Sequence, residues 1–155
     1  MLLGYFRKFQ AFTPFALLIV SVLLWADVYL FPEQVFSRPE GGAGPLYRLI
    51  EPFVQAYPLL SSWIAIVFLL LQSFYLNHVA NTHGLSDRYS FLTGFVYFLF
   101  MSSHGHFHYL HPVLFSNAFL IIALNRIFDT SDEKNTQVEV FNSGFLIALA
   151  GMFFQ

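Results

Sequence analysis

The sequence predicts an all-α fold, a polytopic transmembrane helical bundle of about five spans with an interfacial amphipathic helix between the first two. Of the 155 residues, 57% are hydrophobic and 10% are charged, whereas a soluble domain usually has about 25% charged residues. The charges gather in short segments, which leaves long apolar stretches. Apolar side chains that face acyl tails incur no solvation cost. We therefore expect a single transmembrane domain, residues 1–155, with the lipid bilayer as its solvent.

The first predicted span covers residues 12–31 and follows the basic pair Arg7 and Lys8. A basic start before an apolar core also occurs in secretory signal peptides. Here the apolar stretch is longer than a signal peptide needs, and no small-x-small cleavage motif follows it. We therefore expect a retained signal anchor.

Residues 32–57 form the predicted external loop. Pro39, Gly41, Gly42 and Gly44 mark its irregular first part. Beyond it, apolar residues recur at helical spacing with polar residues between them, namely Leu46, Leu49, Ile50, Phe53 and Val54. This pattern predicts a short helix that lies in the membrane interface. The alternative is an ordinary extramembrane loop.

The remaining predicted spans cover residues 59–80, 89–110, 112–128 and 140–155. Gly84 is a plausible stop for the second span, and Pro112 suits the first turn of the fourth. The uncharged part of the third span has only about 15 residues, short for a full crossing. We expect its helix to continue through the histidine-rich stretch, and a tilted or re-entrant element is the alternative. Because the last apolar run reaches Gln155, we expect the N-terminal part of a longer protein or, alternatively, a natural short form.

The distribution of basic residues predicts the orientation. With the N-terminus inside, the external side holds only Arg38 and Arg48. The cytoplasmic segments hold the other five, Arg7, Lys8, Arg88, Arg126 and Lys134. Cytoplasmic loops carry the excess of Lys and Arg. We therefore expect a multi-pass protein of the bacterial inner membrane, with a cytoplasmic N-terminus and with the amphipathic and histidine-rich segments both outside.

Charge and cysteine content exclude several kinds of function. A net charge of −2 without a basic stripe argues against a nucleic-acid partner. The absence of cysteine excludes disulfides, thiolate metal sites and Cys nucleophiles.

A histidine cluster is the most conspicuous local feature. On a helix, His104, His108 and His111 are spaced i, i+4, i+7 and share one face, while His106 points elsewhere. Imidazoles so placed are candidate ligands of zinc or another transition metal, or titrate near neutral pH. No carboxylate or cysteine accompanies them within the segment. A hydrogen-bonded polar helix end is the alternative interpretation.

Two carboxylates near the external end of the first span are candidate catalytic bases. Asp27 lies close to that end and Glu33 follows in the external loop. An acid near a membrane-spanning segment is a functional hypothesis, and a solvated flanking charge is the alternative. If the substrate is a sugar linked to a polyprenyl lipid, Arg38 and Arg48 are candidates to bind its phosphate.

Three stretches carry a resemblance to a known family. They are QSFYLNHVANTHGL (72–85), LHPVLFSNAFLIIALNRIF (110–128) and VFNSGFLIALAGMFF (140–154). Together they resemble an uncharacterised polytopic inner-membrane family of Bacteroidota, whose members look about twice as long, so that this chain is similar to its N-terminal half. The resemblance implies a location rather than an activity. The histidine run departs from the family's pattern, which puts a family-wide metal site in doubt.

Three functions are compatible with the sequence. The preferred hypothesis is a non-catalytic subunit of a cell-envelope membrane complex, because no catalytic motif is present and small residues suit helix packing. The first alternative is a membrane glycosyltransferase, or part of one, that uses a polyprenyl-phosphate sugar with Asp27 or Glu33 as base. The second is a proton-coupled transporter or motor component, supported only by the histidines. Other membrane proteins are the expected partners of the preferred form.

Overall fold

The computed structural model describes residues 12–30, 43–86, 90–104, 107–129 and 136–154, without the side chains of residues 12–14 and 27. Within these ranges the chain is all-helical, which confirms the predicted fold class. The helices are α2 (Phe12–Leu24), α3 (Ala26–Leu30), α5 (Tyr47–Ala56), α6 (Pro58–Thr82), α7 (Leu92–Ser102), α8 (Pro112–Asp129) and α9 (Thr136–Phe153).

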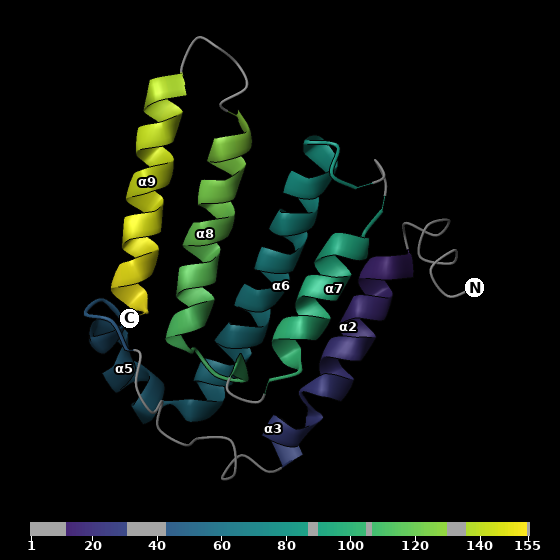
Figure 1. Cartoon of the computed structure of the whole chain (residues 1–155). Coiled ribbons are helices and arrows are strands. Elements are labelled where there is room, and N and C mark those ends of the chain that lie inside the picture. Colours follow the sequence, from purple (N-terminus) through teal and green to yellow (C-terminus); the bar gives the residue numbers. More distant parts are fainter. Residues whose placement is uncertain (1–11, 31–42, 87–89, 105–106, 130–135, 155) are drawn as a thin grey trace.

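Helices α2, α6, α7, α8 and α9 stand side by side, and each runs in the opposite direction to the one before it in this chain order (Figure 1). One end of the bundle, called the α5 end below, holds α3, α5, residues 107–111 and the last turn of α9. The opposite end holds the last turns of α6 and α8 and the first turn of α9. The amphipathic helix and residues 107–111 of the histidine-rich segment thus lie at the same end of the bundle, and their placement outside the membrane stays a prediction.

Three helices of the described chain are long and apolar enough to cross a membrane, namely α6, α8 and α9. They coincide closely with the second, fourth and fifth predicted spans. The helices of the first and third predicted spans, α2 and α7, are apolar but shorter. Three of the five predicted crossings thus coincide with a helix that is long enough to span a membrane. The crossings by α2 and α7 stay predictions.

The expectation that the third helix continues through the histidine-rich stretch is wrong, because α7 ends at Ser102. Residues 107–111 form turns, with the His111 N–H bonded to the Tyr109 carbonyl oxygen. These turns place the side chains of Tyr109 and Leu110 in the core, where both are buried. In addition, a residue that precedes proline disfavours the helical conformation, and His111 precedes Pro112.

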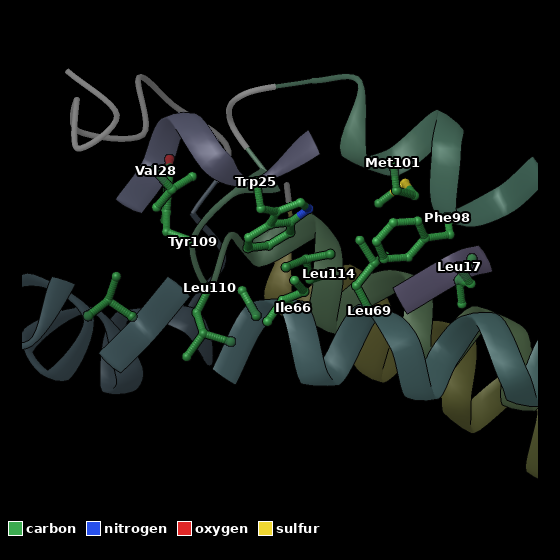
Figure 2. Close-up of a cluster of buried hydrophobic side chains, with 12 residues drawn as sticks. Leu17, Trp25, Val28, Ile66, Leu69, Phe98, Met101, Tyr109, Leu110 and Leu114 are labelled. Atoms are coloured by element: carbon green, nitrogen blue, oxygen red, sulfur yellow. The ribbon is translucent and has the colours of Figure 1, made fainter. Parts of the chain in front are cut away.

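The core lies where α2 and α3 pack against α6, α7 and the segment before α8 (Figure 2). Trp25, which separates α2 from α3, is fully buried there. The other labelled side chains of this core come from five helices and the segment before α8, and they are Leu17, Val28, Ile66, Leu69, Phe98, Met101, Tyr109, Leu110 and Leu114. Aromatic and aliphatic side chains thus join the short helices to the long ones.

Two glycines determine how α6 ends and how closely α7 packs against it. Gly84 has a φ of 69°, and the Leu85 N–H donates to the Ala80 carbonyl oxygen, so α6 ends as the sequence predicts. Gly94 of α7 lies so close to α6 that a Cβ there would stand 2.6 Å from the Ser73 carbonyl oxygen. Its absence allows α6 and α7 to pack closely.

The last turn of α9 is capped by the chain that precedes α5. The N–H groups of Gly44 and Leu46 donate to the carbonyl oxygens of Phe153 and Met152 at 2.9 and 3.1 Å. The final carbonyls of a helix have no partner within the helix. This short stretch therefore satisfies two of them and holds α5 beside α9.

Candidate functional site

The α5 end contains a buried contact between Trp25, Ser102 and His108. The Trp25 indole Nε1 donates to the Ser102 hydroxyl at 3.1 Å, and the indole lies 4.7 Å from the imidazole of His108. The His108 Nε2 is 3.1 Å from the Ser102 carbonyl oxygen. His108 is 3% exposed. The imidazole is thus part of the packing that joins α3 to the end of α7.

A second buried contact surrounds the peptide unit of Leu110. The Tyr47 hydroxyl donates to its carbonyl oxygen, and its N–H donates to the Ser61 hydroxyl at 3.1 Å. Burial, reinforced by the nearby Tyr109 and Glu51, raises the pKa of Tyr47 well above its usual value. Burial also raises the pKa of Tyr109. Both hydroxyls therefore stay protonated at neutral pH, and the Tyr47 hydroxyl serves as a hydrogen-bond donor.

The three candidate metal ligands are not brought together. His104 is exposed and lies 3.1 Å from the Ser103 hydroxyl, while His108 is buried against Ser102. The His111 Nδ1 accepts from the Val113 N–H. No group of three His, Asp or Glu side chains in the described part of the chain is arranged to hold a metal ion. The shared helical face that the spacing predicted does not exist, because α7 ends before the histidines.

The candidate catalytic and phosphate-binding residues are described only in part. Asp27 belongs to α3, whose neighbour Trp25 contacts the histidine segment, but its carboxylate lies outside the described side chains. Glu33 and Arg38 lie outside the described residues. Arg48 is an exposed residue in the first turn of α5.

A polar network crosses the apolar interior of the bundle and joins α6, α7 and α8. The Gln72 Nε2 donates to the Leu114 carbonyl oxygen at 2.8 Å, and the Tyr97 hydroxyl donates to the Gln72 Oε1 at 2.6 Å. Tyr97 also interacts with the side chain of Asn117. The Asn117 Nδ2 points to the Met101 sulfur at 3.5 Å. The side-chain amides thus bridge neighbouring helices.

Beside this network lies a groove of about 380 Å³ between α7, α8 and α9. We call it the Tyr97–Asn117 groove after its two polar residues. Its remaining lining is aliphatic and consists of Leu120, Ile121, Ala123, Leu124, Ile127 and Ile147. Sequence reasoning missed this groove, because its walls come from three separate helices.

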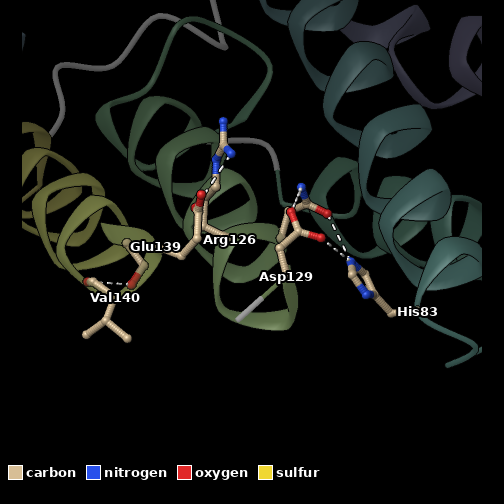
Figure 3. Close-up of polar contacts among 7 residues, drawn as sticks. His83, Arg126, Asp129, Glu139 and Val140 are labelled. Carbon is tan, nitrogen blue, oxygen red and sulfur yellow. Dashed lines mark hydrogen bonds and ion pairs between the residues drawn. The ribbon is translucent and has the colours of Figure 1, made fainter. Parts of the chain in front are cut away.

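The opposite end carries the polar contacts drawn in Figure 3. The His83 Nε2 lies 3.2 Å from the Asn125 Oδ1 and 3.7 Å from a carboxylate oxygen of Asp129. Arg126 pairs with Glu139 at 3.5 Å. The first contact joins α6 to α8, and the second joins α8 to α9. Both lie at helix ends that border the predicted cytoplasmic loops.

Comparison with protein-family models, curated proteins and solved structures gives no match to this chain.

Proposed function

We propose that this chain is a non-catalytic subunit of a multi-protein complex in the bacterial inner membrane, with its N-terminus in the cytoplasm. The observation that carries the proposal is the uncovered surface of α9. Only 17% of the 18 residues of α9 are buried, compared with 39% of an 18-residue stretch of α6. Helix α9 packs along α8 and leaves its other face open.

Small residues lie along the middle of that open face. Gly144, Ala148 and Gly151 are spaced four and three residues apart, so they share one side of the helix. A Cβ at either glycine would meet nothing within 4 Å. Phe141 and Phe145, 73% and 57% exposed, stand beside this row. The surface is therefore a shallow valley with aromatic residues beside it.

A valley of this kind suits a transmembrane helix of another protein better than it suits lipid. Glycine in a helix interior costs about 1 kcal/mol relative to alanine. A face that only meets acyl chains gains nothing from that cost, whereas small residues let two membrane helices approach closely. The proposed partner is therefore a second polypeptide that contributes a spanning helix.

The buried polar groups also support a structural role. Gln72, Ser73 and Asn77 bind backbone or side-chain groups of α7 and α8. Such bonds hold the helices at fixed positions. A subunit that works by docking needs this rigidity.

The experiment is purification in mild detergent followed by mass spectrometry of the proteins that stay bound. We expect a second polypeptide at fixed stoichiometry, lost in Ala148→Leu, which fills the valley. The matched control is Val67→Leu, which adds bulk to an exposed site of α6 and should retain the partner. A lone polypeptide, or a partner that is equally retained by both variants, overturns the proposal.

The alternative proposal is the glycosyltransferase that uses a polyprenyl-phosphate sugar. One observation favours it, namely that α3, which carries Asp27, lies at the α5 end beside the histidine segment. A lone polypeptide that co-purifies with a polyprenyl lipid would support this alternative. Asp27→Asn would then abolish sugar transfer if Asp27 is the base.

A further inference from the structure

The Tyr97–Asn117 groove is large enough for a small ligand, and its lining is mostly aliphatic. Its volume of about 380 Å³ lies at the lower end of the range of small-molecule sites. Four of its aliphatic residues, Leu120, Leu124, Ile127 and Ile147, are between 37% and 47% exposed. Half-exposed aliphatic walls show that the groove opens sideways, onto the surface of helices long and apolar enough to span a membrane. Its natural occupant is therefore a hydrocarbon chain.

The two polar residues give the groove a direction, because both lie toward the end at which α8 begins. Asn117 follows Pro112 by five residues, which places it about 8 Å along the helix axis. Ile127 lies ten residues further, about 15 Å deeper. The groove thus begins near the α5 end and becomes purely aliphatic away from it.

The amide of Asn117 provides a hydrogen-bond donor at the polar end. The Tyr97 hydroxyl gives its proton to Gln72. The Asn117 amide, in contrast, interacts with the Tyr97 hydroxyl and points its Nδ2 to the Met101 sulfur at 3.5 Å. A thioether is a weak acceptor. A carbonyl oxygen that entered the groove would be a better partner for this amide.

We propose that the groove binds one acyl chain of a glycerolipid whose ester carbonyl oxygen accepts a hydrogen bond from the Asn117 amide. In a bilayer the ester groups lie near the interface and the chains run toward the midplane. That order matches a donor near the start of α8 followed by an aliphatic channel. The groove meets α9 at Ile147, which lies three residues after Gly144, so it borders the open face of α9 that is proposed to dock a partner.

The first test labels the protein in lipid nanodiscs with a phosphatidylcholine that carries a diazirine on one acyl chain. We expect cross-links to concentrate on the groove residues of α8 and on Ile147. Leu124→Trp fills the groove and should abolish the enrichment of cross-links at these residues. The matched control, Leu71→Trp, changes an exposed site of α6 and should leave it intact. Uniform labelling of all exposed apolar residues, unaffected by Leu124→Trp, overturns the proposal.

The second test isolates the hydrogen bond by comparing the ester lipid with an ether-linked analogue that has the same chain and no carbonyl oxygen. In the unmodified protein the ester lipid should label the groove more strongly than the ether lipid. In Asn117→Leu the two lipids should label it equally. Thermal unfolding of each variant shows whether the bundle is retained. Equal labelling by both lipids in the unmodified protein contradicts the role of Asn117.

Discussion

The Tyr47 hydroxyl donates a hydrogen bond to the carbonyl oxygen of Leu110 at 2.7 Å, across 63 residues of sequence. Ser61 accepts from the N–H of the same residue. One peptide unit thus connects the amphipathic helix α5, the start of α6 and the segment that leads into α8. The chain before α5 is also held to the last turn of α9 through Gly44 and Leu46. Hydrogen bonds therefore connect α5, α6, α9 and the segment before α8 at the α5 end.

The first prediction concerns this hydrogen bond. Tyr47→Phe keeps the ring but leaves the Leu110 carbonyl oxygen buried without its donor, which costs about 1–3 kcal/mol. We expect a lower midpoint in thermal unfolding of the detergent-solubilised protein. Tyr57→Phe, at a residue 58% exposed, is the matched control and should unfold like the unmodified protein. Equal midpoints for the two variants would show that the contact contributes no stability.

The second prediction concerns alkaline pH. Burial raises the pKa of Tyr47 above its usual value of 10. Above about pH 10 the unfolded chain therefore loses this proton while the folded chain keeps it. The free energy of unfolding should be flat with pH below that point and should fall as pH rises beyond it. Tyr109, whose pKa is raised by burial too, acts in the same direction. Tyr47→Phe should reduce the alkaline slope without abolishing it, and an unchanged slope would contradict this assignment.

The third prediction concerns the cap on α9. A Cβ at Gly44 would overlap the carbonyl group of Met152, so Gly44→Ala must displace the cap at a cost of about 1–3 kcal/mol. Hydrogen exchange should become faster at Gly44 and Leu46, whose amides bond the end of α9. Gly144→Ala is the matched control, because a Cβ there meets nothing within 4 Å. It should be neutral or slightly stabilising. Faster exchange in the control but not in Gly44→Ala would refute this account.

The helices could be predicted where local signals determine their ends. Pro112 opens α8 and Gly84 follows the end of α6, and both elements match the predicted spans within a few residues. The apolar spacing over residues 45–57 likewise predicted the helix observed at Tyr47–Ala56. These signals depend on residues that are close together in the chain, so they can be recognised from the sequence alone.

The histidine segment could not be predicted, because distant residues determine its shape. The i, i+4, i+7 spacing of His104, His108 and His111 is compatible with a helix. The observed turn instead buries Tyr109 and Leu110. It is held by hydrogen bonds from Leu110 to Ser61 and Tyr47, which lie 49 and 63 residues earlier in the sequence. The Tyr97–Asn117 groove has the same origin, since its walls come from three helices. No local pattern reports which side chains meet across such distances.

The fourth prediction concerns Gln72, whose amide joins three helices. It donates to the Leu114 carbonyl oxygen of α8 and accepts from the Tyr97 hydroxyl of α7. Gln72→Leu keeps a similar volume but leaves both partners unsatisfied in an apolar interior, which should cost about 1–2 kcal/mol. The measurement is resistance to unfolding by SDS in mixed micelles. Gln137→Leu, at an exposed residue in the first turn of α9, should show no loss. If Gln72→Leu unfolds at the same SDS fraction as this control, the network does not hold the helices together, and apolar packing alone positions α6 against α8.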